Sequence, residues 1–360
     1  MVGTITNAAL AHGWEKHSDS RFYTAAGPST GEALLAQEFL RSLKDYIDPH
    51  LRIRESREGN YEDLYAAALQ IVQDETFEIV NPLISTSLSE IMCNSEKLWR
   101  QQPAHIDDNA FASLADRATE LIQWTVFHLL DPVRVPVGMD ALASVAGIVD
   151  QCDVFTLNHD LLIERLFDQF GVDYADGFGQ KDGDVQTFNW SWNAPAANIR
   201  LFKLHGSIDW YRYRYPQYVQ YAKVRSDPEH RKNSVGDRLT LLDTKPLFLT
   251  GTTVKEQSYG YSLVGELFAE FRSRLRHHHT LICCGYGWSD KGINIRLRQW
   301  LYDAHDNRLI ILHRGSLDEL KNKRCWYWYW DELEKAGKLV VVPKWLCDCS
   351  MQDLQPFFSN

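Results

Sequence analysis

The chain has 360 residues, of which 44% are hydrophobic and 24% are charged, a composition that is ordinary for a globular protein and excludes a disordered or fibrous one. With 38 Lys and Arg against 48 Asp and Glu, its formal net charge is −10, which argues against a general affinity for nucleic acid or anionic membranes. No apolar run approaches the roughly 20 residues that a membrane-spanning helix needs. The segment Met1–Leu10 lacks the basic start and apolar run of a secretory signal.

The cysteines indicate a reducing compartment. There are seven of them, and an odd number in a chain of this length does not suggest a disulfide framework. Several lie in or beside apolar, strand-like runs, where a reduced thiol packs as a small hydrophobe. We therefore expect a cytoplasmic protein. The seven are Cys93, Cys152, Cys283, Cys284, Cys325, Cys347 and Cys349.

The stretch 30–130 is predicted to be mostly helical. Asn60 can cap a helix that begins at Tyr61, and Glu62 and Asp63 suit the positive end of that helix's dipole. Later in the stretch, apolar residues recur at steps of three and four and form one helical face. The segment Asp131–Pro136 then breaks the helix and marks a boundary.

After Asp150, short β-prone runs alternate with helical stretches. This alternation is typical of a parallel sheet covered by helices on both faces, so we predict an α/β fold here. The expected strands are Cys152–Leu157, Leu201–Leu204, Pro246–Thr250, Thr280–Cys284, Leu309–Leu312 and Leu339–Val342. The expected helices are Leu161–Phe170, Leu263–Leu275 and Lys291–Ala304.

The first expected strand ends in the polar sequence Thr156–Asp160. Ligands of open parallel sheets bind beyond the carboxyl ends of the strands, so these side chains are candidates for a site. The plainer interpretation is a turn, in which Asp160 starts the next helix and Asn158 shapes the chain.

The second polar strand end is Lys203–Trp210, which contains His205 and Gly206. Histidine is the side chain best suited to proton transfer near neutral pH, and a glycine after it can present the ring to a cleft. The plainer interpretation is a histidine satisfied by the backbone.

The third polar strand end is Gly285–Asp290. Glycines let the backbone approach a ligand, and the following helix can offer its N-terminus to a phosphate. The plainer interpretation is a turn between a strand and a helix, with Ser289 or Asp290 as the helix cap.

Together and in this order, the three motifs resemble the sirtuin-like family. Thr156–Asp160 looks like its threonine-x-asparagine-x-aspartate motif, and Lys203–Asp209 looks like its histidine–glycine motif. Gly285–Asp290 is similar to the glycine-tyrosine-serine-x-x-aspartate element of a prokaryotic branch linked to anti-phage defence. The resemblance covers about Asp150–Gly315 and implies a Rossmann-like, mostly parallel sheet covered by helices.

The resemblance also implies an organisation for the whole chain. The motif Asn60–Glu62 and its helix resemble, more loosely, the α-helical insert of that branch. We therefore expect a single sirtuin-like domain over 1–360, a mostly helical insert over 33–130, and the main part of the Rossmann-like core over 150–345.

One departure concerns the N-terminus. The family opens with a strand and a Gly-Ala-Gly-x-Ser loop that cradles the pyrophosphate. The nearest counterpart is Asn7–Ala11, with Ala8 and Ala9, after a weak strand Val2–Thr6; Ala25–Ser29 would match the segment just downstream. The glycines and the serine are absent from this loop, and Cβ atoms there would crowd a close phosphate.

A second departure concerns zinc. Deacetylases of the family carry two Cys-x-x-Cys pairs after the histidine motif, which bind zinc in a tetrahedral array. No cysteine lies between His205 and Thr280. We therefore expect no metal and no deacetylation, and the zinc-less defence branch is known for hydrolysing NAD⁺.

The resemblance implies roles for individual residues. Asn158 would hold the attacking water or the ribose hydroxyls, Asp160 would contact the nicotinamide carboxamide, and His205 would act as a general base. The expected contacts to NAD⁺ are Thr156, Gly206, Gly285, Tyr286, Ser289, Asp290, Ala8 and Ala9.

The expected function is therefore an NAD⁺ hydrolase acting as the effector of an abortive-infection system. The resemblance implies a homo-oligomer, or a partner such as an ATPase, a helicase or an Argonaute-like chain, that activates it. Two alternatives remain: an ADP-ribosyltransferase that uses the same pocket, and a non-catalytic subunit that binds NAD⁺ or ADP-ribose.

Four other features are ambiguous. The alternation in Tyr211–Tyr215 fits single-strand binding, which the net charge argues against, or a hairpin with one packed face, and we expect a lid or a subunit interface there. The aromatic run Cys325–Trp330 fits an interface or a core strand. The run His277–His279 complements a helix dipole better than it forms a metal site. Cys347 and Cys349 are expected to be free thiols.

Overall fold

The computed structural model describes most of the chain. The described residues are 1–11, 30–77, 84–101, 109–145, 148–191, 197–215, 218–225, 228–243, 245–251, 255, 259–260, 262–321, 326 and 328–358. Within these ranges, no helix combines the length and the apolar character that crossing a membrane requires.

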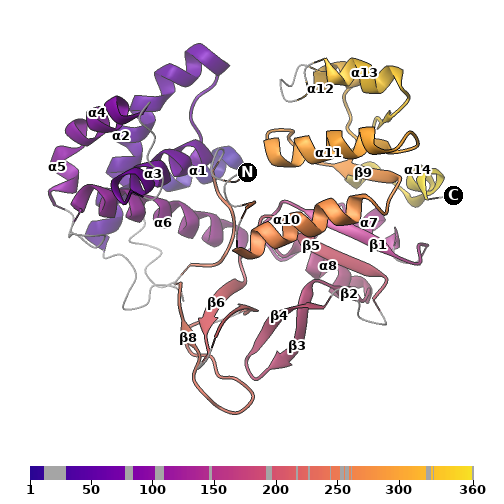
Figure 1. Cartoon of the computed structure of the whole chain (residues 1–360), viewed down its shortest axis with the longest axis horizontal. Coiled ribbons are helices and arrows are strands. Elements are labelled where there is room, and N and C mark those ends of the chain that lie inside the picture. Colours follow the sequence, from indigo (N-terminus) through magenta and orange to yellow (C-terminus); the bar gives the residue numbers. More distant parts are fainter. Residues whose placement is uncertain are drawn as a thin grey trace.

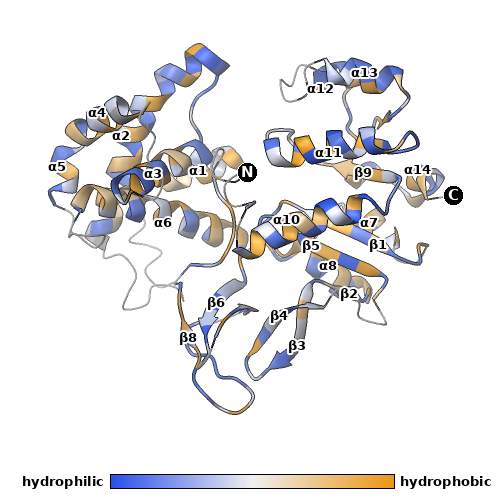
Figure 2. Ribbon diagram, in the orientation of Figure 1, coloured by the Kyte–Doolittle hydropathy of each residue, from blue (hydrophilic) through white to orange (hydrophobic). Residues whose placement is uncertain are grey.

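The N-terminal part is a helical bundle (Figure 1). Its helices are α1 (Val2–Leu10), α2 (Thr30–Glu55), α3 (Tyr61–Glu75), α4 (Ser85–Asn94), α5 (Glu96–Trp99) and α6 (Ala110–Leu130). Figure 2 shows hydrophobic residues through this bundle, whereas the far end of α2 is hydrophilic. The helical prediction for this stretch is confirmed; that the stretch is an insert stays a prediction.

The predicted cap of α3 is confirmed. The Asn60 side chain accepts hydrogen bonds from the backbone N–H groups of Glu62 and Asp63, at 2.8 and 3.3 Å. The Asp63 carboxylate accepts from the Asn60 N–H at 3.0 Å, which completes a capping box. The predicted boundary is also confirmed, because α6 ends at Leu130.

The predicted strand Val2–Thr6 is wrong, because this segment is the first half of helix α1. Ile5 and Ala9, one helical turn apart, are buried in the core of the bundle, and the Thr6 hydroxyl accepts a hydrogen bond from the Tyr61 N–H at 3.0 Å. Tertiary packing thus overrides the β propensity of the segment. Asn7–Ala11 is consequently the end of a helix, and not a loop after a strand.

The α/β part contains two parallel sheets of three strands each (Figure 1). One has the order β1 (Cys152–Thr156), β5 (Ile199–Lys203), β2 (Tyr174–Ala175). The other has the order β11 (Leu339–Val342), β10 (Arg308–Leu312), β9 (Thr280–Cys284). The helices beside them are α8 (Leu162–Phe170), α10 (Ser262–Leu275) and α11 (Lys291–Asp303). The mixed α/β fold with parallel strands is therefore confirmed.

A five-stranded antiparallel sheet was not predicted. Its order is β3 (Gly177–Asp182), β4 (Val185–Ser191), β7 (Val219–Lys223), β6 (Trp210–Arg214), β8 (Thr240–Leu241). The hairpin of β6 and β7 confirms that Tyr211–Tyr215 has one packed face, because Tyr211 and Tyr213 are 1% and 0% exposed, whereas a lid or a subunit interface there stays a prediction. The predicted strand Pro246–Thr250 is wrong: Phe248 makes only an isolated bridge to Gly206.

Two tryptophans of the C-terminal aromatic run belong to the core, whereas Trp328 is exposed, and helix α13 begins only at Tyr329. Trp326 and Trp330 are buried and pack against Trp288 with ring centroids 5.2 and 5.0 Å apart. Cys325 and Tyr327 lie outside the described residues. The remaining short helices are α7 (Asp140–Val145), α12 (Leu317–Lys321), α13 (Tyr329–Lys335), η2 (Leu346–Asp348), α14 (Met351–Leu354) and η3 (Gln355–Phe357).

Candidate functional site

The parallel pairing of β1 with β5 brings the first two motifs to one sheet edge. Thr156 is in register with Lys203, so Asn158 and His205, each two residues further on, leave the sheet at the same level. The loops they begin are joined: the Ile208 N–H donates to the His159 carbonyl at 3.0 Å. The ring centroids of His159 and His205 are 6.1 Å apart.

His205 is held by two side chains from other elements. Its Nε2 lies 2.6 Å from the Tyr259 hydroxyl oxygen and 3.1 Å from Oδ2 of Asp290. The Tyr259 hydroxyl donates to the same Oδ2 at 2.6 Å. His205 and Asp290 are only 3% and 8% exposed. This side-chain triangle replaces the backbone-satisfied histidine that the plainer interpretation expected.

Burial keeps the imidazole neutral at pH 7. Burial lowers the pKa of His205, and the hydrogen bond to Asp290 offsets this only in part. Burial alone would raise the pKa of Asp290, but hydrogen bonds from His205, the Ile293 N–H and Tyr259 outweigh it and lower that pKa to about 2. An ionised carboxylate only accepts hydrogen bonds, so we assign the imidazole proton to Nε2 and leave Nδ1 as the proton acceptor.

Tyr259 is a site residue that the sequence did not reveal. Its ring stacks on Phe268 of α10 with centroids 3.9 Å apart and planes at 7°. Gly292 of α11 makes room for it, because a Cβ there would lie 2.6 Å from the tyrosine ring. Nearby, Lys255 pairs with Glu62 of α3 at 2.9 Å, which ties this segment to the helical bundle. No local pattern around Tyr259 marks it, since its partners are distant in sequence.

The turn Thr156–Asp160 is held by its own hydrogen bonds. The Asn158 N–H donates to the Thr156 hydroxyl at 3.1 Å, and Oδ1 of Asp160 accepts from the Leu162 N–H at 3.0 Å. Asp160 is buried, whereas Asn158 is exposed. Asp160 therefore holds the turn just before α8, whose N-cap is Leu161, and its contact with nicotinamide stays a prediction.

A buried ion pair between Lys203 and Glu164 stabilises this turn. Lys203 Nζ donates to the Asp160 carbonyl and pairs with Glu164 Oε1 at 2.8 Å. Both side chains of the ion pair are almost fully buried. These contacts therefore hold the carboxyl ends of β1 and β5 together, at the point where the motifs Thr156–Asp160 and Lys203–Trp210 meet.

Gly206 is required by close backbone packing. Its φ is +77°, and a Cβ would lie 2.9 Å from Cα of Phe248 and closer still to the Leu247 carbonyl. The segment 247–249 is bonded to the motif on both sides: the Ser207 N–H donates to the Leu247 carbonyl at 2.9 Å, and the Leu249 N–H donates to the His205 carbonyl at 2.8 Å. Gly206 is thus required by the close packing of the 247–249 backbone against the histidine motif.

We expect Gly206→Ala to lower the free energy of unfolding by at least about 2 kcal/mol, because the alanine adds backbone strain and an overlap. Urea unfolding measures this. Gly285→Ala is the matched control, since Gly285 has φ +65° but a Cβ there would meet nothing within 4 Å. Equal losses in the two variants would contradict the role given to the 247–249 segment.

In the third motif, Gly285–Asp290, the backbone at the two glycines has free space around it, whereas the tyrosine hydroxyl is hydrogen-bonded within the protein. A Cβ on Gly285 or Gly287 would meet no atom within 4 Å, and Ser289 is exposed. The Tyr286 hydroxyl lies 3.0 Å from Asn294 Oδ1. Asp290 caps α11, because its Oδ1 accepts from the Ile293 N–H at 2.9 Å. The other carboxylate oxygen of Asp290, Oδ2, contacts His205, so Asp290 joins the third motif to the histidine motif.

Ala8 and Ala9 do not join the site. Both lie in α1, and Ala9 is fully buried in the bundle core. The pyrophosphate loop predicted here is therefore not formed, because the segment is helical, and a contact of Ala8 or Ala9 with the pyrophosphate stays a prediction. The downstream match, Ala25–Ser29, lies outside the described residues.

Within the described ranges, no group of three or more His, Cys, Asp or Glu side chains is placed to hold a metal ion. His278 pairs with Asp153 at 2.7 Å, and His279 lies 3.2 Å from Asp306. Cys347 and Cys349 are free thiols, as predicted.

Comparison with known families covers the part of the chain that carries the site. A family model described as SIR2-like domain matches residues 153–334, just over half of the chain. The match begins in β1 and includes Asn158, His205, Tyr259 and Asp290. No curated protein matches the chain. The SIR2-like domain indicates NAD⁺-dependent chemistry on a Rossmann-like fold, and the chain belongs to the SIR2-like domain family.

Proposed function

We propose that this protein hydrolyses NAD⁺ to ADP-ribose and nicotinamide. The observation that carries the proposal is the sheet edge where an exposed Asn158 and a buried, neutral His205 follow adjacent parallel strands at the same level. The family match supports NAD⁺ as the substrate. Deacylation is not proposed, because the sequence has no cysteine between His205 and Thr280 to form the expected zinc module.

The reaction breaks the bond between the ribose C1′ and nicotinamide. Its transition state resembles an oxocarbenium ion, and nicotinamide departs neutral, so positioning and dipoles matter more than acid catalysis. In our proposal, the Asn158 amide holds the attacking water or a ribose hydroxyl beneath the sugar. Nδ1 of His205 accepts the proton from that water or hydroxyl, and Asp290 stabilises the imidazolium that forms.

The other predicted contacts surround this centre in our proposal. The backbone at Gly285 and the exposed Ser289 would face the ribose, and Asp160 would approach the carboxamide. Tyr259 is a positioning residue, because its hydroxyl lies between Nε2 of His205 and Oδ2 of Asp290.

The test is incubation of the purified chain with NAD⁺, followed by chromatography. Equal amounts of free nicotinamide and ADP-ribose support hydrolysis. Nicotinamide with ADP-ribose attached to an added protein or nucleic acid would instead identify a transferase. Binding of NAD⁺ without turnover, under all activating conditions named below, would identify a non-catalytic subunit. The last outcome is favoured by the absence of a glycine loop at Ala8 and Ala9.

Replacing the Asp290 charge should move the acid limb of the pH profile of kcat/KM to lower pH. His205 must be neutral to accept a proton, so activity rises with pH through its pKa. The Asp290 charge raises that pKa, and Asp290→Asn removes the charge while keeping a residue that caps α11. The rate on the plateau should also fall, because the base is weaker.

Tyr259→Phe is the comparison for that experiment. It removes the hydroxyl and leaves the carboxylate charge, so the acid limb should move less than in Asp290→Asn. An acid limb that moves to higher pH in Asp290→Asn would contradict a neutral His205 supported by this carboxylate.

We also propose a cellular role as an abortive-infection effector that is inactive until triggered. Activation would come from self-association, or from a partner such as an ATPase, a helicase or an Argonaute-like chain. NAD⁺ turnover per chain that rises with protein concentration would support self-association. Turnover that appears only when a partner is added would support the second route.

A further inference from the structure

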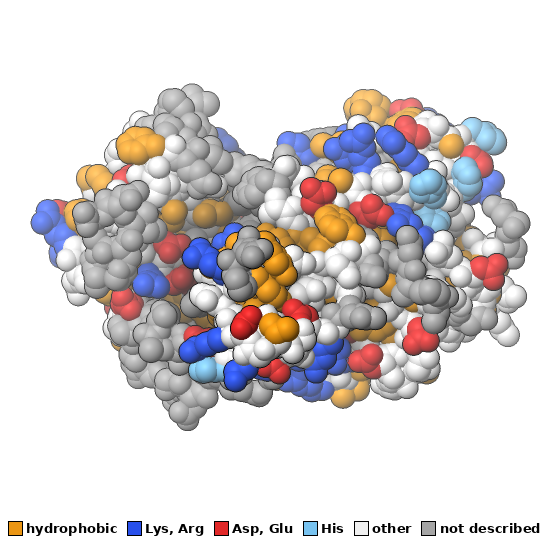
Figure 3. Space-filling model, turned by 60° about the horizontal axis from the view of Figure 1, so that its bottom comes forward, with side chains coloured by type: hydrophobic (Ala, Val, Ile, Leu, Met, Phe, Trp, Pro, Cys, Tyr) orange, Lys and Arg blue, Asp and Glu red, His pale blue; other side chains and the backbone are white. Residues whose placement is uncertain are grey.

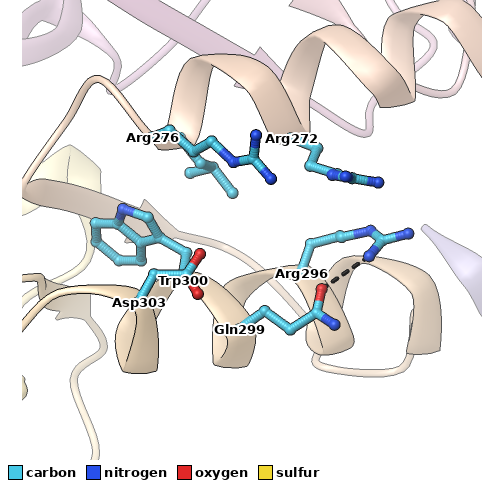
Figure 4. A pocket seen from close by; sticks show the side chains of 7 residues that line it. Arg272, Arg276, Arg296, Gln299, Trp300 and Asp303 are labelled. Atoms are coloured by element: carbon cyan, nitrogen blue, oxygen red, sulfur yellow. Dashed lines mark hydrogen bonds between the residues drawn. The ribbon is translucent and has the colours of Figure 1, made fainter.

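A second candidate site lies between α10 and α11. A cavity of about 350 Å³ opens there (Figure 4). Arg272 reaches it from the last turn of α10 and Arg276 from the turn just after that helix, whereas Arg296, Gln299, Trp300 and Asp303 reach it from α11. It is distinct from the reaction site, because His205 meets α11 at its first cap, Asp290, whereas Asp303 is the last residue of that helix.

The three arginines of this cavity have no carboxylate partner among the described residues. Arg296 donates to the Gln299 amide oxygen at 2.7 Å, and its guanidinium lies 5.6 Å from the centre of the Phe268 ring. In contrast, Arg274 on the same stretch of α10 pairs with Glu270 at 2.6 Å. Figure 3 shows Lys and Arg side chains gathered above and right of centre, on the half of the molecule that carries α10 and α11.

The helix dipole explains only part of this cluster. Positive residues near the end of α10 complement the negative end of its dipole, which accounts for Arg272 in its last turn and for Arg276 just after it. It does not account for Arg296, which lies in the first half of the 13-residue helix α11. Three guanidinium groups and one carboxylate, that of Asp303, line the cavity, so it carries a net positive charge that a bound anion would compensate.

We propose that this cavity binds a small nucleotide that carries at least two phosphate charges. The planar donors of guanidinium match phosphate oxygens and bind them with paired hydrogen bonds. Asp303 and the Gln299 amide supply acceptors for ribose or base donors, which an inorganic anion would not use. The volume lies at the small end of the range for ligand pockets, roughly 300–1,000 Å³.

The proposal is tested by isothermal titration calorimetry with ADP and with pyrophosphate, at low and at physiological salt. Each of Arg276→Gln and Arg296→Gln should weaken ADP binding about tenfold or more, because a charge-assisted hydrogen bond is lost. Arg298→Gln is the matched control: it removes one charge from α11, but its guanidinium lies over the Tyr329 ring, 4.4 Å from its centre. Binding should weaken as salt increases.

The reaction site needs its own control, because ADP resembles part of NAD⁺. His205→Ala should leave ADP binding to the arginine cavity unchanged. The proposal is overturned if neither probe binds the wild-type chain, if Arg276→Gln and Arg296→Gln bind ADP as well as Arg298→Gln does, or if pyrophosphate binds as tightly as ADP. No part of this readout depends on NAD⁺ turnover, so it can succeed or fail independently of the proposed hydrolase.

Discussion

Asn158→Ala is expected to reduce nicotinamide release from NAD⁺ by about 100-fold or more, the cost of losing a hydrogen-bonding group that acts in the transition state. The side chain is exposed at the carboxyl edge of β1. Its removal should therefore leave the free energy of unfolding within about 0.5 kcal/mol of the wild type. Initial rates and a thermal melt measure the two effects.

Asn198→Ala is the control for that variant. Asn198 is also exposed, and it precedes β5 at the opposite edge of the same sheet, where its carbonyl accepts from the Cys152 N–H at 2.9 Å. Alanine keeps that backbone contact, so turnover should not change. A folded Asn158→Ala that releases nicotinamide at the wild-type rate would remove Asn158 from the mechanism.

His205→Ala is expected to reduce turnover by about 100- to 10,000-fold, the usual contribution of a general base. The buried ring also holds Asp290 and Tyr259, so some stability should be lost as well. His205→Asn, which keeps a polar side chain, separates the two effects: it should be at least as stable as the alanine variant and equally inactive.

His279→Ala serves as the control histidine. It is exposed, and it precedes β9 at the edge of the sheet away from Asp290. Its loss should leave turnover unchanged. Equal losses in His205→Ala and His279→Ala would indicate that the rate follows general stability, and not base catalysis by His205.

Local sequence patterns predicted the elements that local forces determine. The capping box at Asn60 and Asp63 is formed by residues three apart, so it could be identified without the fold. The alternation in Tyr211–Tyr215 likewise identified a hairpin face. The motifs at Asn158 and His205 each follow a strand of a parallel sheet, which is why their positions in the sequence were enough to expect them at one edge.

The errors come from long-range packing. The segment 2–10 is a helix because the bundle buries Ile5 and Ala9, which no local propensity shows. Most of the five-stranded antiparallel sheet was missed, because the local hairpin of β3 and β4 is irregular in register and β4 pairs with β7 across a long separation. Tyr259 reaches His205 from 54 residues away, and only the fold brings them together.

The most direct test of the account is a crystal structure of the chain with ADP-ribose bound. The account predicts that the ribose bearing the free anomeric carbon lies at the carboxyl edge of β1 and β5. That carbon should lie between the Asn158 amide and the His205 ring, with the imidazole still bonded to Asp290 through Nε2. A ribose bound elsewhere, with Asn158 and His205 contacting no part of the ligand, would contradict it.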